Sequence, residues 1–139
     1  MRIEIPDDKK QVHEMTMPIR WGDMDSYRHV NNAVYFRYME QARVEWIGSL
    51  GYSVSPDKET VLIVNAFCNF YKQVNYPGEL LIKTYVGNVG KSSVDIFNLM
   101  AIVTEPEVIC AAGGATMVWV DLIKNKSCPW PNDVLEKLR

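Results

Sequence analysis

The hydrophobic period of this chain changes from a helical repeat to a strand repeat near Val61, and this change limits the folds that the chain can adopt. Apolar residues at helical spacing form one stripe: Tyr35, Tyr38, Met39, Ala42 and Trp46. From Val61 onward, apolar residues recur at every second position through most of the remaining sequence. An amphipathic helix followed by half-buried strands must bury its stripe against the apolar faces of those strands.

Four strand-like segments follow the helix, and the connections between them are short. They cover residues 62–70, 79–87, 92–103 and 108–122. An earlier strand is expected over residues 15–21, with Trp21 on its inward face together with Met15, Met17 and Ile19. Short connections favour antiparallel neighbours. The sequence therefore predicts a single α+β domain over residues 1–139, with one long helix lying on a curled antiparallel sheet.

Local signals predict where the helix ends and how closely it approaches the sheet. Asn31 is a suitable N-terminal cap, while Gly48 and Gly51 supply a stop. The run of small residues CAAGGA at 110–115 lies within a strand, and no Lys-Ser or Lys-Thr pair follows it. This run predicts close packing of the helix on the sheet rather than a phosphate-binding loop. A short terminal helix is expected to open at Asn132 or Pro131.

Charge and hydropathy exclude several classes of function. Fifteen basic and seventeen acidic residues give a net charge of −2, so no global positive field attracts nucleic acid. No apolar run approaches the ~20 residues that a membrane helix needs, and the charged N-terminal segment lacks the apolar core of a signal peptide. The three cysteines form no CxxC pair and are expected to be reduced. We expect a cytoplasmic protein without nucleic-acid or membrane partners.

A cluster of polar residues precedes the helix in the segment RWGDMDSYRHVNNAVYFRYMEQAR, residues 20–43. A cap does not explain Asp23, Asp25 and His29, which lie ahead of it. The first turn of a helix presents free N–H groups and the positive end of the helix dipole, which stabilise an oxyanion. The N–H of Asn32 is the candidate donor. A carboxylate beside it acts as a nucleophile or as a general base, and the residues leave this choice open.

The same segment resembles the 4-hydroxybenzoyl-CoA thioesterase-like family of hotdog-fold proteins, in its Asp-x-Asp, its HVNN and its YFRYMEQAR. The resemblance implies a five-stranded sheet wrapped around one long central helix, a homodimer or dimer of dimers with active sites at the interface, and hydrolysis of an acyl-CoA. It implies that Asp25 is the catalytic carboxylate, that the Asn32 N–H faces the thioester carbonyl and that His29 orients water or the carboxylate. No cofactor is implied beyond the CoA of the substrate.

Two further residues have competing interpretations. Arg28 stands where many members of that family have glycine, so a positive φ there would strain it; alternatively, Arg28 reaches an anionic ligand. Glu40 matches the helix glutamate that some other hotdog thioesterases use in catalysis. Because Glu40 can pair with Arg43 at i+3 and Asp25 already fills the catalytic position, we expect a structural role for Glu40.

Other residues are candidates for binding the substrate. The nucleotide end of CoA is expected near the GKSS segment, through Lys91, Ser92 and Ser93. Tyr35 is a candidate for the acyl pocket. A metal is not expected near His29, because the second histidine, His13, lies in the polar leader and no cysteine is near.

Two other functions stay open. One is hydrolysis of acyl groups carried on acyl carrier protein, which a basic docking patch beside the pocket would favour. The other is non-catalytic binding of acyl thioesters, which would normally accompany an added nucleic-acid-binding segment. The acyl chain itself is not predicted, because a shift of one residue in strand register reverses which rings point inward.

Overall fold

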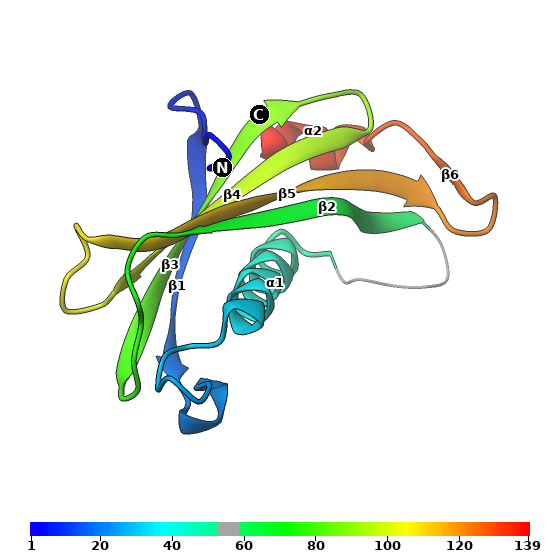
Figure 1. The fold of residues 1–139 in the computed structure, drawn as a ribbon. Helices are drawn as coiled ribbons and strands as arrows, with labels where there is room; N and C mark the ends of the chain where they lie inside the picture. Colours follow the sequence, from blue (N-terminus) through cyan, green and yellow to red (C-terminus); the bar gives the residue numbers. More distant parts are fainter. Residues whose placement is uncertain (53–58) are drawn as a thin grey trace.

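The computed structural model describes residues 1–52 and 59–139, in which an antiparallel sheet curls over one helix (Figure 1). The elements are β1 (Lys10–Ile19), a 3-10 turn (Trp21–Asp23), α1 (Asn32–Ser49), β2 (Glu59–Phe70), β3 (Gly78–Val89), β4 (Ser93–Ile102), β5 (Ile109–Asp121), β6 (Lys126–Ser127) and α2 (Asn132–Leu138). The predicted order of one strand, one helix and further strands is confirmed, as is the short terminal helix.

The strand order in the sheet is β1-β3-β4-β5-β2, with β6 paired to β5, and every pair is antiparallel. The sheet has six strands rather than the predicted five. The additional strand, β6, has only two residues, Lys126 and Ser127, and is too short to show a hydrophobic alternation in the sequence. Consecutive strands are neighbours from β3 to β5, as predicted. β2 instead pairs with β5 and not with β3, which places it at the sheet edge.

The first strand begins earlier and ends earlier than its alternation predicts. β1 spans Lys10–Ile19, and Ile19 is buried as expected. Trp21 does not share the inward face: its side chain is 76% exposed in the 3-10 turn. The prediction for Trp21 is wrong because the N–H of Arg20 donates to the carboxylate of Asp23 (3.2 Å), which turns the chain out of the strand.

The helix α1 begins and ends where its capping residues predict. The side chain of Asn31 accepts a hydrogen bond from the N–H of Ala33 (2.9 Å). At the other end, Gly51 has φ +89, a conformation that glycine adopts without steric cost. All five residues of the predicted apolar stripe are buried. Cap, stop and stripe are therefore confirmed.

The small residues of β5 let the helix lie close to the sheet. A Cβ atom at Gly113 would meet the carbonyl oxygen of Phe67 and would lie 2.6 Å from the sulfur of Met39 on α1. No larger residue fits there without moving the helix. The run at 110–115 therefore serves packing, as predicted.

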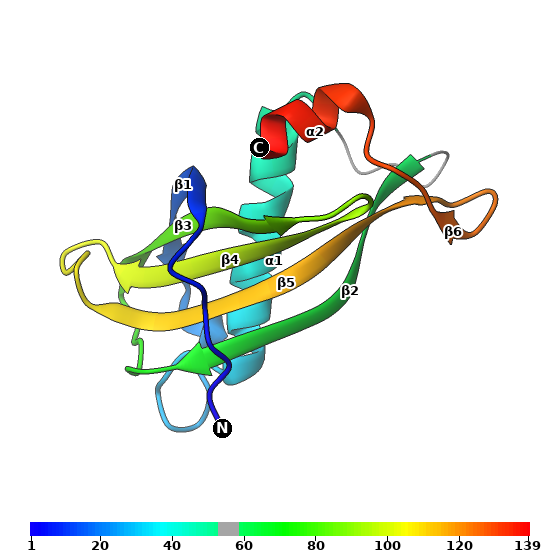
Figure 2. The ribbon, with the colours of Figure 1, turned by 90° about the horizontal axis from the view of Figure 1, so that it is seen from above.

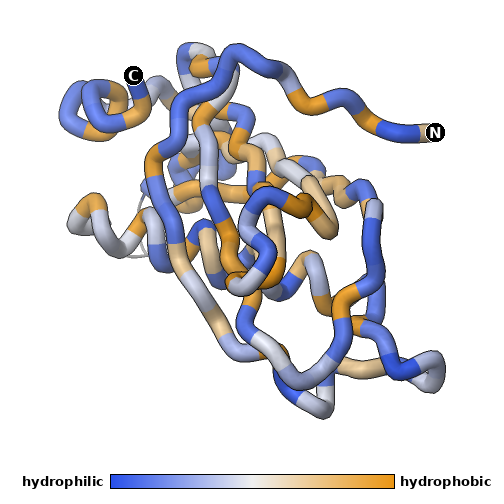
Figure 3. The backbone as a smooth tube through the Cα atoms, turned by 90° about the vertical axis from the view of Figure 1, so that its left-hand side faces the viewer, coloured by the Kyte–Doolittle hydropathy of each residue, from blue (hydrophilic) through white to orange (hydrophobic). Residues whose placement is uncertain are grey.

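The buried core has one part at each end of α1. Tyr35, Tyr38 and Met39 pack in the part near the helix N-terminus. Near the helix C-terminus, Trp46 joins a second cluster with Trp119, Trp130 and the apolar residues of α2. Figure 3 shows the underlying alternation of hydrophobic and hydrophilic residues along the chain. The two ends of the helix are thus covered by different groups.

The predicted inward face of β2 is largely exposed. Leu62, Val64 and Phe70 are 45%, 59% and 46% exposed. Alternation predicts burial of this face, but an edge strand has no neighbour beyond it and only part of β2 lies over α1. β2 therefore presents an apolar, unpaired edge. No helix in residues 1–52 or 59–139 is long and apolar enough to cross a bilayer.

The N-terminal segment crosses the outer face of the sheet, on the side away from α1 (Figure 2). Its backbone is tied to β2 at Ile3, whose N–H donates to the side-chain oxygen of Asn69 (3.2 Å) and whose carbonyl accepts from the same amide group (2.7 Å). Asn69 is buried. This polar leader is therefore held against the sheet by an amide pairing that local sequence patterns do not reveal.

Candidate active site

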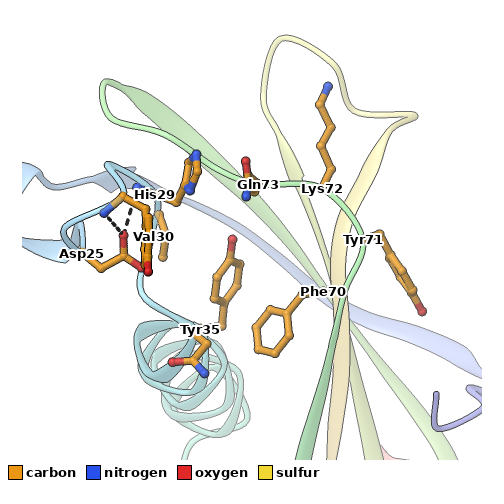
Figure 4. A pocket seen from close by; sticks show the side chains of 10 residues that line it. Asp25, His29, Val30, Tyr35, Phe70, Tyr71, Lys72 and Gln73 are labelled. Atoms are coloured by element: carbon orange, nitrogen blue, oxygen red, sulfur yellow. Dashed lines mark hydrogen bonds between the residues drawn. The ribbon is translucent and has the colours of Figure 1, made fainter. Parts of the chain in front are cut away.

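A pocket of about 690 Å³ opens at the N-terminal end of α1, between the loop before the helix and the end of β2 (Figure 4). Four of the predicted site residues line it: Asp25, His29, Asn32 and Tyr35. The end of β2 and the loop after it supply the opposite wall through residues 70–73. The structure thus brings the three predicted catalytic residues to one cavity.

The carboxylate of Asp25 is held by the backbone of its own loop. Its Oδ1 accepts hydrogen bonds from the N–H of Tyr27 (2.9 Å) and of His29 (3.4 Å). The N–H of Asp25 in turn donates to the carbonyl of His29 (2.9 Å). Because both bonds to the carboxylate use Oδ1, the lone pairs of Oδ2 are left for a reactant. The side chain is half-buried in the pocket wall.

The first turn of α1 supplies a donor to the same pocket. Asn32 is the first residue of the helix. The side-chain oxygen of Asn31 accepts a hydrogen bond from the N–H of Ala33, and its backbone carbonyl accepts one from the N–H of Val34. Within residues 1–52 and 59–139 the N–H of Asn32 has no acceptor, as expected for a first helical residue. This N–H and the helix dipole both favour negative charge in the pocket.

His29 contributes to the site through its backbone and its position. Its N–H and its carbonyl both bond to Asp25, so the loop geometry depends on it. The imidazole is half-buried, lines the pocket and makes no hydrogen bond to another described residue. The proposed orienting role of the ring stays a prediction.

An aromatic pair forms the apolar wall of the pocket. The rings of Tyr35 and Phe70 meet edge to face, with centroids 5.0 Å apart. Burial raises the pKa of Tyr35 to about 12, and the nearby thiols of Cys110 and Cys68 add to the rise. Tyr35 is therefore a neutral phenol across the physiological range. Figure 4 shows both rings projecting toward the space between α1 and the end of β2.

The other aspartate of the Asp-x-Asp pair is structural. Asp23 is buried and accepts a hydrogen bond from the hydroxyl of Tyr38 (2.7 Å). Burial, together with this bond to Asp23, raises the pKa of Tyr38. The carbonyl of Asp23 also accepts the N–H of Asn31, just before the helix (3.0 Å). Asp23 therefore fixes the loop that carries Asp25.

Glu40 lies outside the pocket, and the predicted pairing with Arg43 is wrong. Glu40 pairs instead with Arg37, whose Nη1 lies 3.0 Å from the carboxylate. Arg43 is only 9% exposed and borders a groove between α1 and β2, where burial lowers its pKa. Both partners are three residues from Glu40, so sequence spacing did not distinguish them.

The remaining candidates lie elsewhere. Three residues of the GKSS segment lie beside Trp119 and Trp130 and do not line the pocket: Lys91 and Ser92 in the β3–β4 turn, and Ser93 at the start of β4. Arg28 lines a separate cavity next to Asp25 and has φ +63, the positive value considered from the sequence. Among residues 1–52 and 59–139, no three His, Cys, Asp or Glu side chains gather closely enough to hold a metal ion.

Sequence reasoning missed the pocket wall contributed by β2. Phe70, Tyr71 and Gln73 line the pocket although they lie 45 to 48 residues beyond Asp25 in the chain. The aromatic-rich FYKQVNYP segment was a possible signal. Its position beside the start of α1 follows only from pairing β2 with β5, which no local pattern specifies.

Comparison with known proteins identifies similar chains along nearly the whole length. The model of the Thioesterase-like superfamily matches residues 19–138. The Bacillus subtilis protein YsmA is 30% identical over 86% of this chain and 80% of its own length. The PA2801 protein of Pseudomonas aeruginosa superposes with a TM-score of 0.89 at 32% identity, covering 94% of this chain and all of that one. XC229 of Xanthomonas campestris, a candidate acyl-CoA thioesterase, has a TM-score of 0.77 at 30% identity over 87% of this chain and 100% of its own.

Proposed function

The chain belongs to the Thioesterase-like superfamily and is a thioester hydrolase, and we propose that it cleaves acyl-CoA to a free acid and CoA with Asp25 as the reacting carboxylate. The observation that supports this proposal is the shared pocket of Asp25 and the first N–H of α1. A resident cofactor has no part in the proposed reaction. The similarity to XC229 supports CoA as the carrier. A cytoplasmic location is part of the proposal.

The proposed chemistry divides between the two groups. The thioester oxygen accepts the N–H of Asn32, so the negative charge that develops on it faces the positive end of α1. Asp25 either attacks the acyl carbon, forming an anhydride that water then opens, or takes a proton from a water molecule that attacks. On both routes the C–S bond breaks, the thiolate of CoA leaves and is protonated, and the oxygen of one water enters the acid.

We further propose that the chain associates with itself through the β2 edge, as a homodimer or a dimer of dimers. β2 has no strand partner on its outer side within the described sheet, and it exposes Leu62, Ile63 and Val64 side by side. An unpaired apolar edge of this length is a template for another strand. Leu62→Lys should lower the solution mass to that of a monomer in light scattering. Ile123→Lys, at a residue 79% exposed on the β5–β6 turn, is the matched control and should leave the mass unchanged.

The direct test of the function is Asp25→Asn assayed against a panel of acyl-CoAs, with the free thiol measured by colour. The change keeps the size of the side chain and the acceptor oxygen for the N–H of Tyr27, but removes the charge. We expect kcat to fall at least 10³-fold, since both nucleophilic attack and general-base catalysis are lost.

Glu40→Gln is the companion variant, because it alters a carboxylate on the same helix outside the pocket. It should keep the wild-type kcat. A wild-type rate in Asp25→Asn would remove Asp25 from the mechanism, and a loss confined to Glu40→Gln would transfer the role to the helix glutamate.

A further inference from the structure

A second pocket, of about 520 Å³, also borders Asp25. It is lined by Trp21, Met24, Arg28 and Tyr76, and shares only Asp25 with the pocket at the start of α1. One carboxylate therefore lies at the border of two cavities, and a ligand long enough to enter both would pass it. Apart from Asp25, the side chains of the second pocket take no part in the hydrolysis described above.

Two aromatic rings at this pocket are exposed. The Trp21 indole is 76% exposed and the Tyr76 ring 48%, and neither belongs to the two core clusters. Folding does not explain two open rings at one cavity. Flat apolar surfaces that water can reach are suited to a stacked nucleobase. Stacking on one aromatic side chain strengthens binding roughly 5- to 150-fold per base.

Arg28 adds a cation, carried on a backbone that hydrogen bonds hold in place. Its N–H donates to the carbonyl of Asp25 (3.0 Å), and its carbonyl accepts from the side chain of Asn75 (2.7 Å). These bonds hold its backbone at φ +63, which is uncommon for a residue with a side chain. Its side chain is exposed, and no carboxylate among residues 1–52 and 59–139 pairs with it. A free guanidinium binds phosphate through two parallel N–H donors.

The cations beside the first pocket are engaged already. Lys72 pairs with Glu105 (3.3 Å), and Arg2 lies over the ring of Tyr71, 5.0 Å from its centroid. Arg28 is therefore the better placed cation for an anionic ligand that also reaches Asp25.

We infer that the second pocket binds the phosphorylated nucleotide end of coenzyme A, with the base on Trp21 and Tyr76 and a phosphate on Arg28. This inference rests on the proposed function, because it places the thioester of the same molecule at Asn32 and the pantetheine arm alongside Asp25. The same inference identifies CoA as the carrier of the acyl group. The arm of an acyl carrier protein has a phosphate but no nucleobase, so Trp21 and Tyr76 favour CoA over a carrier protein.

The test compares one acyl group on two carriers, CoA and pantetheine, the second of which has no nucleotide. The acyl group is the one that wild type hydrolyses fastest from an acyl-CoA panel. Trp21→Ala and Arg28→Asn remove the ring and the cation, and asparagine tolerates a positive φ. Each variant should raise KM for the acyl-CoA at least 10-fold, leave kcat within twofold and leave KM for the acyl-pantetheine unchanged.

Matched controls lie on exposed parts of the surface away from both pockets. Ile123→Ala removes an apolar side chain that is 79% exposed, and Arg37→Gln removes a guanidinium from the outer face of α1. Neither should change KM for either carrier.

The outcomes separate this inference from the proposed function. If KM for the acyl-CoA is unchanged in both variants, or if KM rises equally for acyl-CoA and acyl-pantetheine, the nucleotide site is overturned. Hydrolysis of the acyl-CoA by wild type would still support the proposed function. If wild type hydrolyses neither carrier, the proposed function fails. A fluorescence titration with adenosine 3′,5′-bisphosphate then decides the site: binding that Trp21→Ala and Arg28→Asn weaken supports it, and no binding overturns it.

Discussion

At its N-terminal end α1 faces an open pocket, whereas at its C-terminal end it is covered by aromatic rings and by α2. At the first end, the N–H of Asn32 and the carboxylate of Asp25 line the same cavity. At the second end, Trp46 packs in a cluster with Trp119 and Trp130, whose ring centroids lie 5.7 Å apart. Both ends are close to polar segments that the sequence marks as possible sites.

The difference lies in where the hydrogen-bonding groups of each segment are used. In the GKSS segment, the carbonyl of Lys91 accepts the backbone N–H of Trp130 (3.1 Å), and the carbonyl of Ser92 accepts that of Trp119 (2.8 Å). The carbonyl of Ser93 accepts a hydrogen bond from the indole N–H of Trp130 (3.3 Å). These bonds build the covered end. Before α1, the structural bonds fall on Asp23 and on Oδ1 of Asp25, so a carboxylate oxygen and a helix N–H are left for a ligand. We therefore expect the two ends to respond differently to substitution.

The largest effect on stability is expected at the covered end. Trp130→Ala removes a ring that is 5% exposed, which should lower the free energy of unfolding by about 3–5 kcal/mol. The measurement is urea unfolding followed by circular dichroism. Trp21→Ala, at the exposed ring, is the matched control and should cost under about 0.5 kcal/mol. Similar losses for the two tryptophans would contradict the division between a filled and an open end.

A smaller, pH-dependent effect is expected at the open end. Burial raises the pKa of Tyr35 to about 12, whereas the unfolded chain ionises it near 10. The stability that this difference contributes is complete below pH 9 and is lost as pH rises from about 10 to 12, because the unfolded state releases its proton first. The full loss is at most about 3 kcal/mol, of which about half falls between pH 9 and pH 11.

Urea unfolding at pH 9 and pH 11 measures this loss, with Tyr35→Phe as the comparison. The variant lacks the titrating hydroxyl, so its stability should fall less over the same range. Parallel falls in wild type and variant would show that Tyr35 titrates as an exposed phenol, although it lines the pocket beside Phe70.

The smallest effect concerns the strained loop between the two pockets. Arg28→Gly relieves the positive φ, although glycine also gains freedom in the unfolded chain. The net result should be a rise in the free energy of unfolding of up to about 1 kcal/mol, measured by thermal unfolding. A loss of more than about 1 kcal/mol would mean that the Arg28 side chain stabilises the loop in the absence of a ligand.

Features that depend on local periodicity could be predicted from the sequence. The stripe from Tyr35 to Trp46 is buried because residues three and four apart share a helix face, whatever the rest of the chain does. The cap at Asn31 and the stop at Gly51 are equally local. The position of Asp25 beside the helix start follows from its closeness in sequence to that cap.

Features that depend on distant partners, or on a local turn that interrupts an alternating pattern, could not be predicted. The exposure of Trp21 depends on a hydrogen bond from Arg20 to Asp23, three residues further on, which ends the strand. The exposure of Leu62 and Val64 depends on β2 being an edge strand, and edge position is a property of strand order rather than of alternation. The wall formed by Phe70 requires the β2–β5 pairing, which separates β2 from its sequence neighbour β3.

The central claim is that the first N–H of α1 stabilises the oxyanion of thioester hydrolysis, and Asn32→Pro tests it most directly. Proline is favoured at the first helical position, where it lacks only the N–H that no helix bond uses. The preceding Asn31 has φ −61 and ψ +138, which suits a residue before proline. Asn132→Pro makes the same change at the start of α2, near the covered end.

The measurement is kcat with the best acyl-CoA for both variants, at a temperature where each is fully folded. Asn32→Pro should lose about 10²–10³-fold in kcat, the usual cost of removing one oxyanion donor, with little change in melting temperature. Asn132→Pro should keep the wild-type kcat. A wild-type kcat in Asn32→Pro would contradict the account, because the reaction would then proceed without the donor on which it depends.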